Sequence, residues 1–177
     1  ERILFDRGGG HPKNIFISKS SWNTSMEGKN LAELCIERNL EPSPYNAAIV
    51  VFEIIKGGGA TAVYHAINSD DVDRIMQHPM TSIASDGPIT VFDVGSPHPR
   101  TYGTFARVLG RYVRDRNILT LEEAIRKMAS LPAHILSINK RGLLREGYYA
   151  DITIFDSETV IDKATFEDPH QYAVGIN

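Results

Sequence analysis

The chain has 177 residues, of which 42% are hydrophobic, and its formal net charge is -3. This apolar fraction can support a core, whereas the near-neutral charge gives no sign of a nucleic-acid surface. The sequence has no apolar run of the roughly 18 to 20 residues that cross a membrane. Its single cysteine, Cys35, excludes a disulfide within the chain and is expected to be a small buried hydrophobic residue.

The opening part of the chain, up to residue 59, predicts one strand followed by two helices. Residues 14–18 are short and apolar, as expected of a strand. Residues 27–39 carry apolar side chains at a helical spacing. Ser43 followed by Pro44 predicts the start of a second helix, which the three glycines at 57–59 would end.

The middle of the chain alternates between predicted strands and helices. Strands are expected over residues 60–66 and 80–85, and helices over 70–76, over 101–117 and from the capping box at Thr120 onwards. Such alternation implies an α/β protein with a parallel sheet or barrel. Asp86 would then lie at the C-terminal end of the second strand.

The stretch around Asp86 is the main candidate for chemistry. An apolar run ends in this single carboxylate, and a Pro-rich loop then leads to Arg100 at the start of a helix. Barrel enzymes present catalytic groups at the C-terminal ends of their strands. A carboxylate placed there can take a proton from water and hand it to a leaving amine. The alternative is that Asp86 is only a turn residue before Gly87.

Two segments carry a family resemblance. Ser85-Asp86-Gly87, taken together with residues 98–105 (His-Pro-Arg-Thr-Tyr-Gly-Thr-Phe), resembles the N-acyl-D-amino-acid deacylases, or D-aminoacylases, of the amidohydrolase superfamily. Further similar stretches lie at residues 27–34, 71–79, 121–128 and 165–172. The segment between Gly87 and Pro97 is longer than is usual in that family.

The resemblance implies a fold and a set of roles. Residues 1–59 would be an insertion segment of a metal-dependent TIM barrel, residues 60–136 its last strands and helices, and residues 137–177 strands of a small β-sandwich. Because such a barrel needs roughly 250 residues, the chain is expected to be the C-terminal part of a longer enzyme. Asp86 would be the general base and acid and a weak ligand of the metal, and Arg100 would hold the carboxylate of the substrate.

The implied cofactor is zinc in the full-length enzyme. The six histidines show no His-x-His and no pair four residues apart, so we expect no zinc site within this chain. The main ligands would lie upstream of Glu1. His65 could face the site or be a structural residue, and His98 is interpreted as part of the loop architecture.

The expected partner is a small-molecule N-acyl amino acid, with no nucleic acid and no membrane. Unpaired strand edges would favour self-association of the chain on its own. A cytoplasmic location is expected, and any signal peptide would lie upstream. Two alternatives remain open at this point: a related cyclic-amide hydrolase, or a catalytically silent fragment that acts as a folding or interaction unit.

Overall fold

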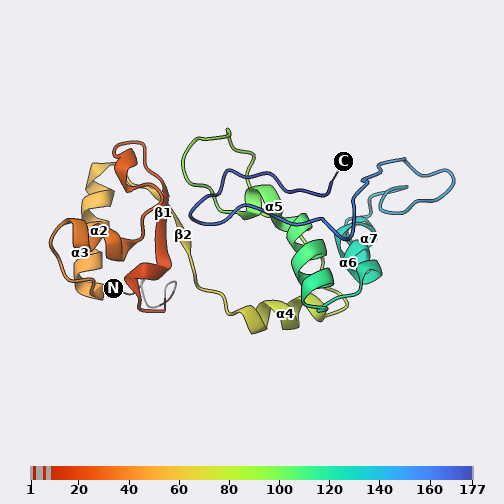
Figure 1. Cartoon of the computed structure of the whole chain (residues 1–177), viewed down its shortest axis with the longest axis horizontal. Coiled ribbons are helices and arrows are strands. Elements are labelled where there is room, and N and C mark those ends of the chain that lie inside the picture. The colour runs from red at the N-terminus through yellow and green to blue at the C-terminus, as the bar shows by residue number, and fades with distance from the viewer. Residues whose placement is uncertain (1, 3–5, 7–8, 177) are drawn as a thin grey trace. The chain divides into compact units, whose positions relative to one another are not determined.

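The computed structural model describes residues 2, 6 and 9–176 (Figure 1). The chain divides into two compact units. Unit 1 consists of Glu1–Ile67, Thr90–His98 and Thr165–His170, and unit 2 of Asn68–Ile89, Pro99–Ala164 and Gln171–Asn177. Each unit therefore combines segments that are distant in the sequence.

Unit 1 packs helices against a small sheet. Its elements are η1 (Pro12–Asn14), β1 (Ile15–Lys19), η2 (Thr24–Met26), α2 (Leu31–Glu37), α3 (Pro44–Gly57) and β2 (Thr61–Tyr64). β1 and β2 pair antiparallel, from Ile15 opposite Tyr64 to Lys19 opposite Thr61 (Figure 1). The predicted strand at 14–18 and both helices of this region are confirmed.

The direction of the sheet corrects a prediction. The alternation after residue 60 predicted a parallel partner for that strand, whereas its partner, β1, runs antiparallel. The turn after α3 explains this pairing. Gly58 and Gly59 have φ angles of 126° and 83°, a region that glycine enters without the steric penalty other residues meet. They let the chain reverse and enter β2 alongside β1.

The core of unit 1 is formed by residues that recur every second position in the strand and every third or fourth position in the helices. β1 buries alternate residues, Ile15 and Ile17, while α2 and α3 bury residues three or four apart. The cluster is made of Ile15, Ile17, Met26, Leu31, Leu34, Cys35, Ala47, Val50 and Ile54. Burial raises the pKa of the Cys35 thiol, in keeping with its predicted role as a buried hydrophobic residue. Each large aliphatic side chain buried here contributes about 1.5–3 kcal/mol.

Unit 2 is built from helices and extended segments. Its helices are α4 (Ser69–Gln77), α5 (Arg100–Arg107), η3 (Val108–Asp115), α6 (Leu121–Met128) and α7 (Ser130–Ile135). α5 runs directly into η3, which is a π-helix, so the helix predicted over 101–117 is confirmed with an irregular second half. The core of this unit consists of Met76, Ala106, Val108, Leu109, Leu119, Ala124 and Val160.

The predicted strand over 80–85 is not formed. The backbone there pairs with a helix instead, because Ile83 donates its N–H to the carbonyl oxygen of Lys127 at 3.0 Å. The expected strands after residue 137 are reduced, among the described residues, to two isolated antiparallel bridges, Phe155 with Ile176 and Ile161 with Val174. A strand needs a neighbour that supplies a full ladder of hydrogen bonds, and within residues 9–176 only β1 and β2 provide one.

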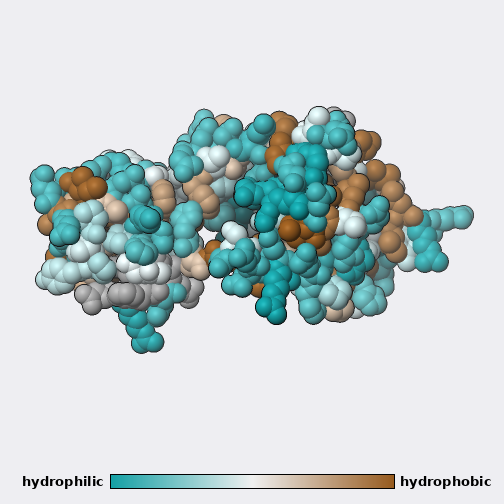
Figure 2. Space-filling view, turned by 60° about the horizontal axis from the view of Figure 1, so that its bottom comes forward, coloured by the Kyte–Doolittle hydropathy of each residue, from teal (hydrophilic) through white to brown (hydrophobic). Residues whose placement is uncertain are grey.

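Apolar side chains are also present on the surface. Figure 2 shows brown apolar patches among the teal polar surface. Exposed apolar residues include Tyr45, Ile49, Phe52 and Ile55 of α3, which share one side of that helix while Val50 and Ile54 on the other side are buried. None of the helices in the described part of the chain has the length and apolarity needed to cross a membrane.

Candidate functional site

Asp86 sits in a local turn at the end of the extended segment 81–85, and a loop of residues 87–99 separates it in sequence from the start of α5. Its φ angle is 48°, in the left-handed region that aspartate tolerates better than most residues. The N–H of Gly87 donates to Ser85 Oγ at 3.4 Å, which closes the turn. The Asp86 side chain is 84% exposed. The carboxylate is therefore presented to solvent by a backbone that points it away from the core.

Arg100 lies directly beside this carboxylate. Its Nη2 atom is 3.0 Å from Asp86 Oδ2, and the arginine side chain is 42% exposed. The structure thus brings together the two residues that the sequence singled out. An ion pair this exposed adds only about 0–1 kcal/mol to stability, so its interest is chemical: a base candidate and a carboxylate-binding candidate share one surface.

Gly87 allows the two parts of the site to meet. A Cβ atom at this position would lie 3.0 Å from Thr101 Cα and 3.2 Å from the carbonyl oxygen of Arg100. Any side chain here would push the turn away from the first residues of α5. The Asp-Gly pair is thereby explained: aspartate supplies the exposed carboxylate and glycine the close approach.

Two buried hydroxyl groups belong to the segments on either side of Asp86. Among the described residues, the buried side-chain atoms without a hydrogen-bond partner are His65 Nε2, Ser82 Oγ and Thr101 Oγ1. Buried polar groups are nearly always paired, and the exceptions often mark water or ligand positions. Ser82 lies four residues before Asp86, and Thr101 follows Arg100 in α5, so these two buried hydroxyls flank the two candidate residues.

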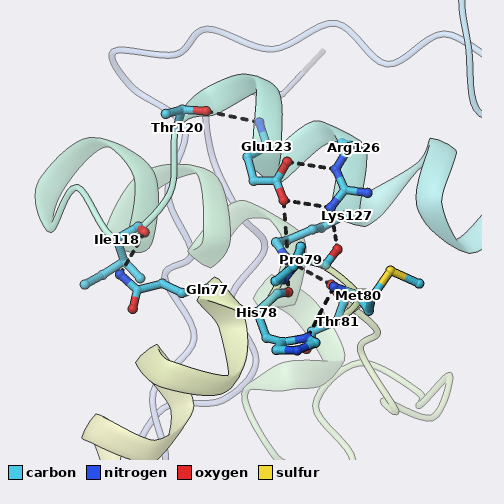
Figure 3. A network of polar contacts seen from close by, with 10 residues as sticks. All are labelled: Gln77, His78, Pro79, Met80, Thr81, Ile118, Thr120, Glu123, Arg126 and Lys127. Carbon is cyan, nitrogen blue, oxygen red and sulfur yellow. Dashed lines mark hydrogen bonds and ion pairs between the residues drawn. The ribbon is translucent and has the colours of Figure 1, made fainter.

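The segment that leads to Asp86 is held by α6 (Figure 3). Lys127 and Arg126 donate to backbone carbonyls of His78, Pro79 and Thr81. Sequence analysis predicted this helix but did not single out Lys127. A signal was present, since Lys127 lies three residues after Ala124 and four before Leu131, on the apolar side of the helical repeat.

The two histidines considered from the sequence belong to unit 1. The His65 ring packs edge-on against Phe16 and Phe166, with centroids 5.2 and 4.3 Å apart. The His98 ring contacts the same Phe166 at 4.9 Å. Both imidazoles thus take part in aromatic packing.

The metal-binding capacity of the described residues is small. They contain no group of three or more His, Cys, Asp or Glu side chains that could hold an ion. Zinc sites need three or four convergent ligands. Asp86 is one exposed oxygen donor, and the residues beside it do not complete a zinc site.

Comparison with known proteins identifies the family. Residues 52–176 match the family model described as "Amidohydrolase family". This chain belongs to the amidohydrolase family. The family assignment confirms the resemblance carried by the Ser-Asp-Gly and His-Pro-Arg segments.

The relatives at higher identity are deacylases. The chain is 44% identical over 174 residues to N-acyl-D-glutamate deacylase and 47% identical over 161 residues to N-acyl-D-aspartate deacylase, both of Alcaligenes xylosoxydans xylosoxydans. These alignments cover 98% and 91% of this chain but 33% and 30% of the relatives. A dihydroorotase of Lactobacillus delbrueckii subsp. bulgaricus matches at 23% identity over 99% of the chain. The chain spans about a third of the length of the curated deacylases it matches.

Solved structures agree with this assignment. The chain is similar to N-acyl-D-glutamate deacylase from Bordetella bronchiseptica, which was crystallised with zinc and a phosphonate mimic of the tetrahedral intermediate, with a TM-score of 0.79 and 37% identity over 93% of this chain and 32% of that one. It is also similar to a D-aminoacylase with a binuclear metal centre, with a TM-score of 0.81 and 36% identity over all of this chain and 34% of that one. The fold is accordingly that of the corresponding part of these amidohydrolases, with mixed helices and strands.

Proposed function

We propose that the complete protein containing this chain is a zinc-dependent deacylase that cleaves the amide bond of N-acyl-D-amino acids. Residues 60–136 would contribute the last strands and helices of its TIM barrel, residues 1–59 an insertion, and residues 137–177 strands of a small β-sandwich. The observation that carries the proposal is the Asp86–Arg100 pair, in which the Asp86 carboxylate lies 3.0 Å from the guanidinium of the first residue of α5. The deacylase relatives, at 44% and 47% identity, supply the reaction type.

Asp86 is assigned the proton transfers of the hydrolysis. A water oxygen adds to the amide carbonyl carbon while the Asp86 carboxylate accepts the proton that this water releases. The carbon–nitrogen bond then breaks, and the protonated Asp86 returns the proton to the leaving amine nitrogen. The products are the carboxylic acid of the acyl group and the free amino acid. The exposed carboxylate in its fixed turn is accessible to both partners of this exchange.

Arg100 is assigned the substrate carboxylate. An N-acyl amino acid keeps a free α-carboxylate, and the planar guanidinium matches that group in a two-point geometry. Because Arg100 lies next to Asp86, holding the carboxylate there also brings the scissile amide near the base. Orientation of this kind can supply a large share of a rate enhancement.

Zinc would supply Lewis-acid polarisation of the carbonyl and a more acidic water. Asp86 is proposed as a weak ligand, and since the described residues contain no cluster of three or more possible ligands, the main ligands would come from other parts of the complete enzyme.

The cyclic-amide alternative finds weaker support. Dihydroorotase matches reach only 23% identity over nearly the whole chain, against 44% for N-acyl-D-glutamate deacylase.

The test is the Asp86→Asn variant of the complete enzyme, assayed with N-acetyl-D-amino acids. Loss of the base should lower kcat by about 10²- to 10⁴-fold. Asp93→Asn is the matched control, because Asp93 is also exposed and also has a left-handed backbone, with φ 61°. Turnover near the wild-type value in Asp86→Asn would overturn the assignment.

A further inference from the structure

Lys127 is an unusual residue for the interior of this protein. Its side chain is 0% exposed, and it is the largest of the fully buried side chains. An ammonium group loses its hydration on burial and must recover the lost interactions from polar partners. The hydrogen-bond partners of Lys127 therefore indicate which segment of the chain its ammonium group fixes.

Those partners are backbone atoms of one segment. Lys127 Nζ donates to the carbonyl oxygens of His78 and Thr81, the latter at 3.2 Å (Figure 3). The carboxylate of Glu123 is farther away, at 3.6 Å. The ammonium thus binds the end of α4 and the start of the segment that leads to Asp86. Cations are favoured at the C-terminal end of a helix.

Two further groups of α6 hold the same segment. Arg126 donates to the carbonyl oxygen of Pro79 and is itself fixed by Glu123 at 2.7 Å (Figure 3). The carbonyl oxygen of Lys127 accepts the N–H of Ile83 at 3.0 Å. Through these contacts the backbone of residues 78–83 is hydrogen-bonded to α6.

The held segment ends three residues before Asp86. Only Ala84 and Ser85 separate Ile83 from the carboxylate-bearing residue. On the far side, Gly87 rests against the first residues of α5. The Asp86 turn is therefore fixed at both ends, by α6 upstream and by α5 downstream. A shift of the upstream end would move the carboxylate relative to Arg100.

We propose that Lys127 is a positioning residue for Asp86, whose buried ammonium fixes the 78–83 segment and so sets the place of the base. This inference rests on the proposed function of Asp86. It assigns Lys127 no contact with the substrate.

The experiment compares Lys127→Met and Lys127→Arg in the complete zinc-loaded enzyme. Methionine keeps the length of the side chain but removes the ammonium. We expect kcat to fall by about 10- to 100-fold, as misplacement of a catalytic group by about 1 Å can do, with KM changed by less than about threefold. Lys127→Arg should recover part of kcat because it can still donate to the carbonyls. The matched control is Lys163→Met, at an exposed lysine of the same unit.

A double-mutant cycle with Asp86→Asn separates positioning from general stability. Once the base is gone, Lys127→Met should lower the residual kcat by less than about threefold, because coupled residues are not additive. Long incubations at high enzyme concentration give these residual rates. A purely structural role predicts losses that multiply, and that result would overturn the inference. So would a Lys127→Met enzyme that behaves like Lys163→Met.

The outcomes also separate the two proposals. If Asp86→Asn keeps wild-type turnover, the proposed function of Asp86 fails and the positioning role falls with it. If Asp86→Asn is inactive while Lys127→Met is unaffected, only the inference fails. Should Lys127→Met not fold, Arg126→Met tests the same segment through a half-exposed residue. A loss of about three- to tenfold that vanishes in the Asp86→Asn background would support the inference, whereas no loss, or a fully additive one, would overturn it.

Discussion

Asp86 and Asp93 show what distinguishes a candidate base from an ordinary turn residue. Both are exposed aspartates in the left-handed region, with φ angles of 48° and 61°. Only Asp86 is followed by a glycine that packs against a helix start, and its carboxylate lies 3.0 Å from a guanidinium. The two aspartates therefore differ in their neighbours and not in their backbone conformation, and the neighbour that marks Asp86 as the candidate base is Arg100.

The role of Arg100 predicts a dependence on the substrate carboxylate. In the complete enzyme, Arg100→Ala should reduce kcat/KM for N-acyl-D-amino acids far more than for the matching amides. Hydrogen bonds to charged groups contribute about 1.5–3 kcal/mol, which is roughly 10- to 150-fold in kcat/KM. The control is Arg111→Ala, an exposed arginine of η3. Equal losses on acids and amides would show that Arg100 does not bind the carboxylate.

Glu123 carries a pH dependence of stability. Its hydrogen bonds with Arg126, with Lys127 nearby, lower its pKa from 4.5 to about 2. A lowered folded-state pKa contributes stability above the unfolded-state value and loses it as the pH falls. The stability difference between wild type and Glu123→Gln should therefore be largest above pH 4.5 and shrink between pH 4.5 and about 2. Urea unfolding at a series of pH values measures this difference in unfolding free energy. A difference that is independent of pH would contradict the lowered pKa of Glu123.

At the scale of elements, capping residues within the sequence were sufficient to predict where the helices begin and end. Ser43 caps α3 by accepting the N–H of Asn46, Gly58 ends that helix, and Thr120 caps α6 by accepting the N–H of Glu123. Each of these contacts lies within a few residues, so the sequence could predict it. The extended segments depend on distant partners. Residues 80–85 were predicted as a strand from their apolar run, yet the N–H of Ile83 and the C=O of Thr81 are bound by Lys127 of α6.

The residues of the site also differ in how far the sequence could predict them. Asp86 and Arg100 were predicted, because a short motif and a family resemblance mark them. Lys127 was not, since a lysine on a helix is ordinarily a surface residue. The helical repeat places Lys127 on the apolar side of α6, but its partners are evident only from the packing of the segment from His78 to Ile83 against that helix. Contacts made through backbone carbonyls leave no trace in residue identity at the accepting positions.

Close packing at η3 gives a prediction for this element. A Cβ on Gly110 would lie 2.4 Å from the carbonyl oxygen of Val160 and 2.6 Å from Ile161 Cδ1. Gly110→Ala should therefore destabilise the fold by about 1–3 kcal/mol, although alanine is the better helix former. Denaturant unfolding measures the change, with Arg111→Ala on the exposed side of η3 as control. A stabilised Gly110→Ala variant would show that the helix and the 160–161 segment are not in contact.

At the scale of the whole molecule, each unit combines segments that are distant in the chain. The core of unit 1 nevertheless comes from residues 15–54, whereas that of unit 2 extends from Met76 to Val160. Unit 1 takes in residues 90–98 and 165–170, and unit 2 takes in 171–177. The helices supply most of the buried residues, while apolar side chains of α3 and of the extended segments stay exposed. β1 and β2 form a two-stranded sheet. Unpaired strand edges and exposed apolar faces both favour association with other chains.

These features predict how the 177-residue chain behaves when it is expressed alone. It should bind no zinc stoichiometrically, because its described residues offer no cluster of ligands and a site needs three or four of them. It should also self-associate with rising concentration and show no amidase activity towards N-acyl-D-amino acids. Metal analysis after dialysis and sedimentation at several concentrations check both points, with the complete enzyme as the positive control for zinc and turnover. Tight stoichiometric zinc binding together with turnover in this chain alone would mean that its own residues build the metal centre. The proposal that the main zinc ligands come from other parts of the complete enzyme would then be wrong.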